Sequence, residues 1–283
     1  MAEEVRNIKD LRAAYYASTH AIDKRCQKHP TVLMIRTKNP CTQNTFEFCP
    51  ECGQEIINDD IARAGAEAEA KIRNFKSYAV FERESIISPK IAKETIGSYE
   101  IHTNQDTEAV NFVNRFVADY FKGRYEGNVI LQGPPGVGKS HLCYSLARAI
   151  NEGYNSKEES KRVLFVSIAE IVTRIQSGWQ EKISDFTEQD ALKLLTSVDY
   201  LFIYDLGTES AMTSQKREAN NWVQTFLFKI FDKRETTIIN TNHTGKELAQ
   251  IYNPKLVSRI GKRSEGNVFT MAGITDKRMK RNF

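Results

Sequence analysis

Eight residues near the middle of the chain, from Gly133 to Ser140, read GPPGVGKS and follow the pattern Gly-x4-Gly-Lys-Ser. Glycines leave backbone N–H groups free to close around phosphate oxygens, the lysine adds a positive charge, and the serine hydroxyl is a ligand for Mg²⁺. An apolar run precedes the loop and a helical pattern follows it, which is the context that this motif requires. We therefore predict a nucleoside triphosphate site with Mg²⁺ on Ser140, formed by Gly133, Pro134, Pro135, Gly136, Val137, Gly138, Lys139, Ser140 and His141.

A second strand should supply carboxylates for the metal and for the attacking water. The candidate is the run VDYLFIYD, which ends at Asp205. Two acids usually stand side by side at this place, whereas Tyr204 and Leu206 flank a single acid here. Glu209 stands a turn too far along to be taken as equivalent. We therefore expect one acid to serve both tasks or to leave one undone, so the strand indicates nucleotide binding more clearly than hydrolysis.

Two residues further along are candidates for sensing the nucleotide. The run TTIINTN ends in Asn242, where an amide could sense the γ-phosphate or the attacking water, although an asparagine at a strand end is also a common turn former. Arg259 follows in LVSRI, on a short predicted helix, without an obvious acidic partner nearby. It is either a surface charge or an arginine finger that reaches the nucleotide of a neighbouring subunit.

Four of the five cysteines lie within a short stretch near the N-terminus. Cys26 and His29 form one pair with two intervening residues, and Cys49 and Cys52 form another. Two such pairs predict a tetrahedral Zn²⁺ site, and four protein ligands leave no open position, so the metal would be structural. Cys41 could replace His29, and reduced thiols without metal are the alternative. Cys143, in the helix after the loop, is predicted to be a small buried residue.

The pattern of the chain changes at about residue 85. A leading amphipathic helix is expected at 5–25, a β-rich run at 31–35 and a second helix at 58–78. The second helix either connects two domains or packs on the zinc module. Beyond residue 85, continuously apolar runs alternate with helical ones, which predicts a parallel sheet covered on both faces. The predicted strands are 128–132, 163–167, 200–204, 236–240 and 267–270, and the predicted helices are 107–121, 139–151, 168–177, 187–196 and 216–231.

The composition fits a soluble globular protein. The chain has 283 residues, 40 Lys+Arg against 36 Asp+Glu, and a formal net charge of +4. Its mean hydropathy is −0.49, and it has neither an apolar run long enough to span a membrane nor an apolar leader, so we expect a cytoplasmic protein without membrane contact. Basic residues gather after Arg259, which indicates either a solvated end or contact with a polyanion.

The chain resembles bacterial and phage helicase loaders of the DnaC/DnaI type. The resemblance rests on GPPGVGKSHL, DLGTE, TTIINTN and LVSRI, and the N-terminal CxxH…CPxC pattern is similar to that of phage members. It implies an α/β fold, an AAA+ P-loop NTPase with a five-stranded parallel sheet, preceded by a small helical zinc-binding domain. The implied domains are residues 1–56 for zinc and helicase contact, 57–84 for a helical linker and 85–283 for the ATPase.

The same resemblance assigns roles to single residues. Lys139 and Ser140 take the nucleotide and Mg²⁺ roles. Asn242 takes the place of sensor I, Arg259 that of the arginine finger and Arg278 that of sensor II. Asp205 holds either the general-base place or the metal-carboxylate place, depending on the alignment. The other place is empty, so the resemblance implies slow hydrolysis. The implied partners are a replicative hexameric DNA helicase, single-stranded DNA and further copies of the ATPase domain. Candidate DNA contacts are Lys161, Arg162, Lys216 and Arg217.

Three other functions compete with an ATP-controlled helicase loader. A transposition-helper ATPase of the IstB type shares the core, but the cysteine module is not expected in such helpers. A non-hydrolysing adaptor would bind ATP for stability and recognise its partner through zinc, and Tyr204 favours that reading. A zinc-finger DNA-binding protein is disfavoured, because no base-reading helix follows the ligands at the required spacing.

Overall fold

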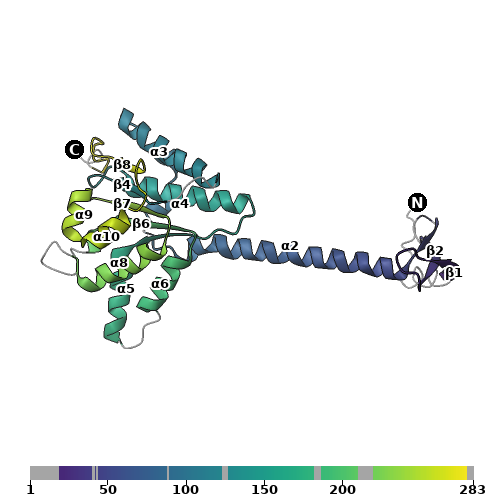
Figure 1. Ribbon diagram of the computed structural model, residues 1–283. Helices are drawn as coiled ribbons and strands as arrows, with labels where there is room; N and C mark the ends of the chain where they lie inside the picture. The colour runs from purple at the N-terminus through teal and green to yellow at the C-terminus, as the bar shows by residue number, and fades with distance from the viewer. Residues whose placement is uncertain are drawn as a thin grey trace. The chain divides into compact units, whose positions relative to one another are not determined.

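The computed structural model describes residues 19–39, 42, 44–87, 89–122, 127–181, 186–209 and 219–278, with the side chains of 179–181 left out (Figure 1). The chain divides into two compact units, Met1–Ala70 and Lys71–Phe283, and each is described by itself. Several predicted features lie outside the described residues. These are residues 5–18 of the expected leading helix, Cys41, Lys216 and Arg217.

The first unit contains an antiparallel three-stranded sheet in the order β1-β2-β3. Its strands are β1 (His20–Arg25), β2 (Leu33–Lys38) and β3 (Thr45–Phe48). The expectation of a helix through residue 25 is therefore wrong for His20–Arg25, because pairing with β2 overrides the helical spacing of the apolar residues. The zinc-binding domain, which was expected to be helical, therefore contains a three-stranded sheet.

A single helix, α2 (Pro50–Glu84), begins in the first unit and continues into the second. Proline suits the first position of a helix, because its ring fixes φ at a helical value and that position needs no N–H donor. The Ala-, Glu- and Lys-rich sequence that follows has high helix propensity. The expected connector at 58–78 is thus part of a longer helix that also carries Cys52.

The second unit contains the predicted five-stranded parallel sheet, in the order β5-β6-β7-β4-β8. Every strand pair in it is parallel. The strands are β4 (Val129–Gln132), β5 (Val163–Ser167), β6 (Tyr200–Leu206), β7 (Thr237–Thr241) and β8 (Val268–Thr270). In a parallel sheet all carboxyl ends lie at one edge, so the residues after β4, β6 and β7 meet there.

Helices cover both faces of this sheet (Figure 1). They are α3 (Asn104–Phe121), α4 (Lys139–Ser156), α5 (Ile168–Glu181), α6 (Glu188–Ser197), α8 (Asn221–Lys233), α9 (Gly245–Ile251) and α10 (Pro254–Ile260). Two short 3-10 helices, η1 (Ile91–Lys93) and η2 (Ile96–Ser98), precede α3. Capping boxes at Thr103, Thr187 and Thr244 begin α3, α6 and α9 by satisfying free backbone donors.

Alternate residues of β4, β5, β6 and β7 enter two separate hydrophobic cores. Leu164 and Val166 of β5 pack with residues of α5, α6, α8, α9 and α10, whereas Val163 and Phe165 pack with residues of α3 and α4. This alternation follows from the two-residue period of a strand. None of the helices among the described residues combines the length and apolarity that crossing a membrane requires.

Candidate functional site

The loop after β4 has backbone conformations that glycine adopts without strain. Gly136 and Gly138 have φ of 85° and 92°. A side chain on Gly136 would overlap the carboxylate of Asp276, and one on Gly138 would overlap the ring of Tyr99. The glycines therefore serve two purposes, since they permit the turn and they let the C-terminal segment and Tyr99 lie directly against the loop.

Lys139 begins α4 and is buried. Its Nζ donates a hydrogen bond to the carbonyl of Pro134 at 2.7 Å, across the loop. Burial lowers the pKa of Lys139 to about 8, the charge of Asp205 opposes this shift, and the charge of Arg278 adds to it. Three residues predicted for the site thus interact electrostatically although they come from distant parts of the sequence.

Asp205, near the end of β6, has an unusual backbone conformation. Its φ is 55°, in the left-handed region that few aspartates adopt. Its N–H donates to Oδ1 of Asn240 at 2.6 Å, and its carbonyl accepts from Oγ1 of Thr208 at 2.7 Å. Burial raises the pKa of the Asp205 carboxyl, while the charges of Lys139 and Arg278 oppose this rise. The backbone that carries the carboxylate is therefore held by one hydrogen bond at its N–H and one at its carbonyl.

Asn240 is a site residue that the sequence analysis missed. It is fully buried in β7, and its amide links two parts of the site. Oδ1 accepts from Asp205, and Nδ2 donates to Oγ of Ser140 at 3.3 Å. A sequence signal existed, because an amide inside the buried run TIINT needs a hydrogen-bond partner. Asn240 thus connects the predicted magnesium ligand to the single acid.

Tyr204 and Glu209, the neighbours of Asp205 in sequence, are engaged elsewhere. The hydroxyl of Tyr204 donates to Oε1 of Glu170 at 3.0 Å, and its ring stacks on Phe165 with centroids 4.9 Å apart. Glu209 is fully buried and accepts hydrogen bonds from the Gly207 N–H, at 3.0 Å, and from the hydroxyl of Tyr252. Asp205 is therefore the acid of this strand end whose charge acts on Lys139.

The segment that carries Arg278 is fastened to the phosphate loop through Lys277. The Lys277 N–H donates to the carbonyl of Gly136 at 3.0 Å, and its Nζ lies 2.9 Å from Oδ1 of Asp106 and 3.6 Å from the centre of the Tyr99 ring. Burial alone would raise the pKa of Asp106, but hydrogen bonds from Lys277, His102 and Thr103 outweigh it and hold that pKa below its usual value. This ion pair fixes the backbone beside Arg278.

Asn242 and His141 lie close to the loop but differ in their surroundings. Asn242 follows β7 directly and is half-buried. His141 faces the segment before α3, because its Nε2 donates to the carbonyl of Thr95 at 2.8 Å and its Nδ1 lies 3.3 Å from Oε2 of Glu94. The structure thus ties His141 to the segment around η2.

Arg259 lies at the other end of the sheet from the phosphate loop. Asn128, which precedes β4, donates from Nδ2 to the carbonyl of Arg259 at 2.9 Å, whereas the loop follows the end of β4. The Arg259 guanidinium pairs with Asp232 at 2.8 Å, an acidic partner that the sequence did not reveal. Any contact of Arg259 with a nucleotide would therefore involve a different subunit.

Two of the four candidate DNA contacts are within the described residues. Lys161 pairs with Asp199 at 3.4 Å, and Arg162 donates to the carbonyl of Ser197. Both side chains therefore help to join the start of β5 to the end of α6. Their roles in DNA binding stay predictions, as do those of the other two.

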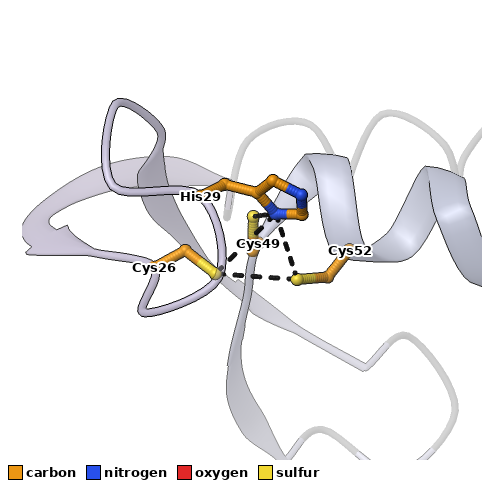
Figure 2. A group of neighbouring side chains, drawn as sticks. All are labelled: Cys26, His29, Cys49 and Cys52. Carbon is orange, nitrogen blue, oxygen red and sulfur yellow. Dashed lines mark hydrogen bonds between the residues drawn. The ribbon is translucent and has the colours of Figure 1, made fainter.

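In the first unit, Cys26, His29, Cys49 and Cys52 converge from three segments (Figure 2). Their potential ligand atoms all lie within 4.8 Å of one another. Sγ of Cys26 is 3.6 Å from Sγ of Cys52, and Nδ1 of His29 is 3.4, 3.6 and 4.0 Å from the sulfurs of Cys52, Cys49 and Cys26. A tetrahedral zinc with ordinary bond lengths separates its ligands by about 3.5 to 3.8 Å. The donor set and its spacing therefore fit zinc.

Neighbouring groups orient and polarise these ligands. Nε2 of His29 lies 3.3 Å from Oε1 of Glu55, whose other oxygen lies 2.5 Å from Nζ of Lys28. Such a carboxylate fixes the imidazole so that Nδ1 faces the thiols. A hydrogen bond from the backbone N–H of His29 is the main cause that lowers the pKa of the Cys26 thiol to about 6. The pKa of the Cys52 thiol is raised to about 11, mainly because of its hydrogen bond with Cys26. A cation would relieve the repulsion between neighbouring thiolates.

Comparison with known proteins places the second unit in context. The family described as IstB-like ATP binding protein matches residues 66–262. The crystal structure of the DnaI is similar at 22% sequence identity, over 68% of this chain and 96% of that chain, with a TM-score of 0.51. The crystal structure of the DnaC helicase loader is similar at 19% identity, over 66% of this chain and 100% of that chain, with a TM-score of 0.49. The likeness to the DnaI structure shows a shared fold.

Proposed function

We propose, from the premise that this chain belongs to the family of IstB-like ATP binding proteins, that it is an ATP-controlled loader of a replicative DNA helicase. It would hold the hexameric helicase and assist its loading onto single-stranded DNA. The observation that carries the proposal is the presence, in one chain, of a phosphate loop in one unit and a Cys₃His cluster in the other. The sequence resemblance to helicase loaders supports the choice of partner.

ATP binding uses groups that the second unit already positions. The N–H groups of the phosphate loop would surround the β-phosphate, and Lys139 would exchange its bond to the Pro134 carbonyl for phosphate oxygens. The hydroxyl of Ser140 would hold Mg²⁺, which supplies positive charge to the phosphates when bound. Arg278, whose charge acts on Lys139 and Asp205, would add a further positive charge, and its contact with the phosphates would depend on which nucleotide is bound.

Hydrolysis, where it occurs, depends on Asp205. Its carboxylate would accept a proton from the attacking water as the new bond forms at the γ-phosphorus and the bond to the ADP oxygen breaks. Because Tyr204 occupies the place of a second acid and is bonded to Glu170, we propose slow hydrolysis. Binding and release of the nucleotide, rather than its hydrolysis, would then provide most of the control over helicase loading.

The two units would divide the work between them. The Cys₃His unit would contact the helicase through a surface that zinc stabilises. The ATPase unit would assemble with further copies, so that Arg259 reaches the nucleotide of a neighbour from the sheet end opposite its own loop. Release of Arg259 from Asp232 would be part of that assembly.

A transposition helper of the IstB type is the second candidate, and the family match favours it. The two functions share the ATP-binding unit and differ in the protein that the chain recognises. A loader recognises a hexameric helicase, whereas a helper recognises a transposase. The Cys₃His cluster favours the loader.

Size-exclusion chromatography with light scattering tests the proposal directly. The purified chain is run with the replicative helicase of its host, with and without ATP and Mg²⁺, and in parallel with a transposase. A complex with the helicase whose stability changes with nucleotide is the expected result. A complex with the transposase alone would replace the loader by the transposition helper. ATP hydrolysis is measured in a separate assay. If no hydrolysis occurs even with DNA and helicase present, the chain would be a non-hydrolysing adaptor.

A further inference from the structure

One face of α2 carries large apolar side chains that are exposed to solvent. Ile57, Ile61, Ile72 and Phe75 are 52%, 65%, 55% and 64% exposed. Exposed apolar residues scattered singly are ordinary, but a continuous set on one helix indicates a contact surface. We define the α2 stripe as Ile57, Ile61, Ala64, Ala68, Ile72 and Phe75, all of which are exposed.

The members of the α2 stripe lie on a single face of the helix. Successive members are four, three, four, four and three residues apart, which keeps them in line on a helix of 3.6 residues per turn. The buried residues of α2 are Asn74, Ser77 and Phe81, and they lie on a different side. Asn74 donates to Asn155 at 3.2 Å, and Phe81 stacks on Tyr144. The α2 stripe is therefore on a different side of the helix from these buried contacts.

The order of large and small residues in the α2 stripe is nearly palindromic. Ile57 and Phe75 each stand nine residues from position 66, and Ala64 and Ala68 each stand two residues from it. Two antiparallel copies of the helix, centred on position 66, would therefore place large residues against large ones at both ends. The alanines would lie at the centre, where small side chains allow two helices to approach closely.

The distribution of charges along α2 also favours an antiparallel pair. From residue 50 to 70 the helix has six acidic residues and one basic residue, whereas from 71 to 84 it has four basic and two acidic residues. An antiparallel pair places the acidic half of one helix beside the basic half of the other, while a parallel pair places like charges together. Asp60 and Lys71 each directly precede a stripe isoleucine, so they lie on the same flank and would face each other across the pair.

We infer that α2 is a self-association surface, on which two copies of this chain pair antiparallel through the α2 stripe. The stripe spans about 27 Å, at 1.5 Å per helical residue. An interface of this length is at the small end of specific protein contacts, so the dimer would be weak and concentration-dependent. The inference concerns α2 alone and does not rest on helicase binding, and it adds an interface to the assembly proposed for the ATPase unit.

Sedimentation equilibrium of the full-length protein, without nucleotide, tests the inference. The wild type is expected to show a reversible monomer–dimer equilibrium. Phe75→Glu and Ile57→Glu should each raise the dimer dissociation constant by about tenfold or more, because each places two charges in the apolar contact. Ile56→Glu is the matched control, since Ile56 is 62% exposed on the same helix but lies off the stripe. Circular dichroism and ATP-analogue binding establish that the variants remain folded.

A charge exchange separates self-pairing from other occupants of the α2 stripe. Asp60→Lys and Lys71→Glu should each weaken the dimer, and the double variant should restore it, because the exchanged charges face each other only in an antiparallel pair. A wild type that stays monomeric, an Ile56→Glu variant as weak as Phe75→Glu, or a double variant without rescue would each overturn the inference. A monomeric wild type that loses helicase binding on Phe75→Glu would assign the α2 stripe to the helicase instead.

Discussion

Asp205 has a conformation that costs an ordinary residue about 1–3 kcal/mol, and its neighbours hold it there. Two hydrogen bonds hold its backbone: its N–H donates to the amide oxygen of the buried Asn240, and its carbonyl accepts from the hydroxyl of Thr208. Strain of this kind persists where the surroundings over-determine a position, and it is common at functional sites. The geometry therefore identifies Asn240 as a positioning residue for the acid and for the Ser140 hydroxyl.

Asn240→Ala is expected to lower ATP turnover by about tenfold to a hundredfold, with a much smaller change in ATP affinity. The substitution removes the acceptor that holds the Asp205 N–H and the donor to Ser140. It should also destabilise the fold by about 1–3 kcal/mol, because the Asp205 donor is left buried without this partner. Steady-state kinetics, analysed for kcat and KM separately, measure the effect.

Ile239→Ala is the control for this prediction, since Ile239 is buried in the same strand but belongs to the core on the opposite face from α4. It should reduce stability and leave kcat near the wild-type value. An Asn240→Ala variant with unchanged kcat would show that the amide has only a structural role.

Lys139 predicts a pH dependence of ATP binding. Its pKa of about 8 in the free protein will rise when phosphates surround it, so binding takes up a proton at pH values above 8. The dissociation constant should therefore be nearly constant below pH 8 and increase above it, by at most about tenfold per pH unit. Calorimetry in buffers with different protonation heats measures the uptake directly.

The control for the pH dependence is Lys139→Arg, which keeps its charge throughout this range. Its binding, although weaker, should not change between neutral and alkaline pH. Equal pH profiles for the two proteins would contradict the assignment to Lys139.

At the scale of elements, one arginine fixes the junction between α6, β6 and β7. Arg234 follows α8 and is buried. Its guanidinium donates to the carbonyls of Leu195, Val198, Asp199 and Thr236 at 2.7–3.2 Å. The carbonyls of Leu195, Val198 and Asp199 lie at the end of α6 and in the turn before β6, where backbone acceptors have no partner in the helix, and that of Thr236 directly precedes β7. Burial lowers the pKa of Arg234 to about 10.

Arg234→Met should lower the free energy of unfolding by about 3 kcal/mol, because it leaves several buried carbonyls without donors. Urea denaturation of the full chain, followed by a signal from the second unit, measures the change. Lys233→Met is the matched control, since Lys233 is the exposed neighbour on the same helix, and it should change stability by less than about 0.5 kcal/mol.

The sequence predicted the elements of the second unit better than those of the first. Strands such as Val163–Ser167 are buried on both faces, so their continuous apolar runs identify them. β1, in contrast, has only Ile22 partly buried, and its sequence lacks a signal strong enough to exclude a helix. The phosphate loop and the cysteine pairs were found from spacing. Asn240, Glu170 and Asp232 were not, because their partners are distant in sequence and only the fold brings them together.

At the scale of the whole molecule, the two units have separate means of stability. The second has two hydrophobic cores around a five-stranded sheet. The first has a small sheet with largely exposed strands, and a domain of this size commonly needs a metal or disulfides. The fit of the Cys₃His cluster to zinc therefore concerns the folding of the first unit.

Chelation of zinc should unfold the first unit and leave ATP binding by the second unit unchanged. Hydrogen exchange over His20–Phe48, measured together with ATP-analogue binding, checks both parts of the prediction. Metal analysis of the untreated protein should find about one zinc per chain. Cys49→Ser should lose the metal, whereas Cys41→Ser should keep it, because four other ligands complete the site. Zinc lost on Cys41→Ser would place Cys41 in the site instead of His29.

The strand order of the second unit has a consequence for synthesis on the ribosome. β4, which leads into the phosphate loop, has β7 and β8 as its neighbours, and these strands are more than 100 residues further along the chain. β4 therefore emerges from the ribosome long before either neighbour exists, and its backbone N–H and C=O groups have no strand to pair with until then. The sheet of the first unit, by contrast, is complete within the first 48 residues. We expect the nascent chain to acquire its metal first and to need protection from aggregation until residue 270 has been translated.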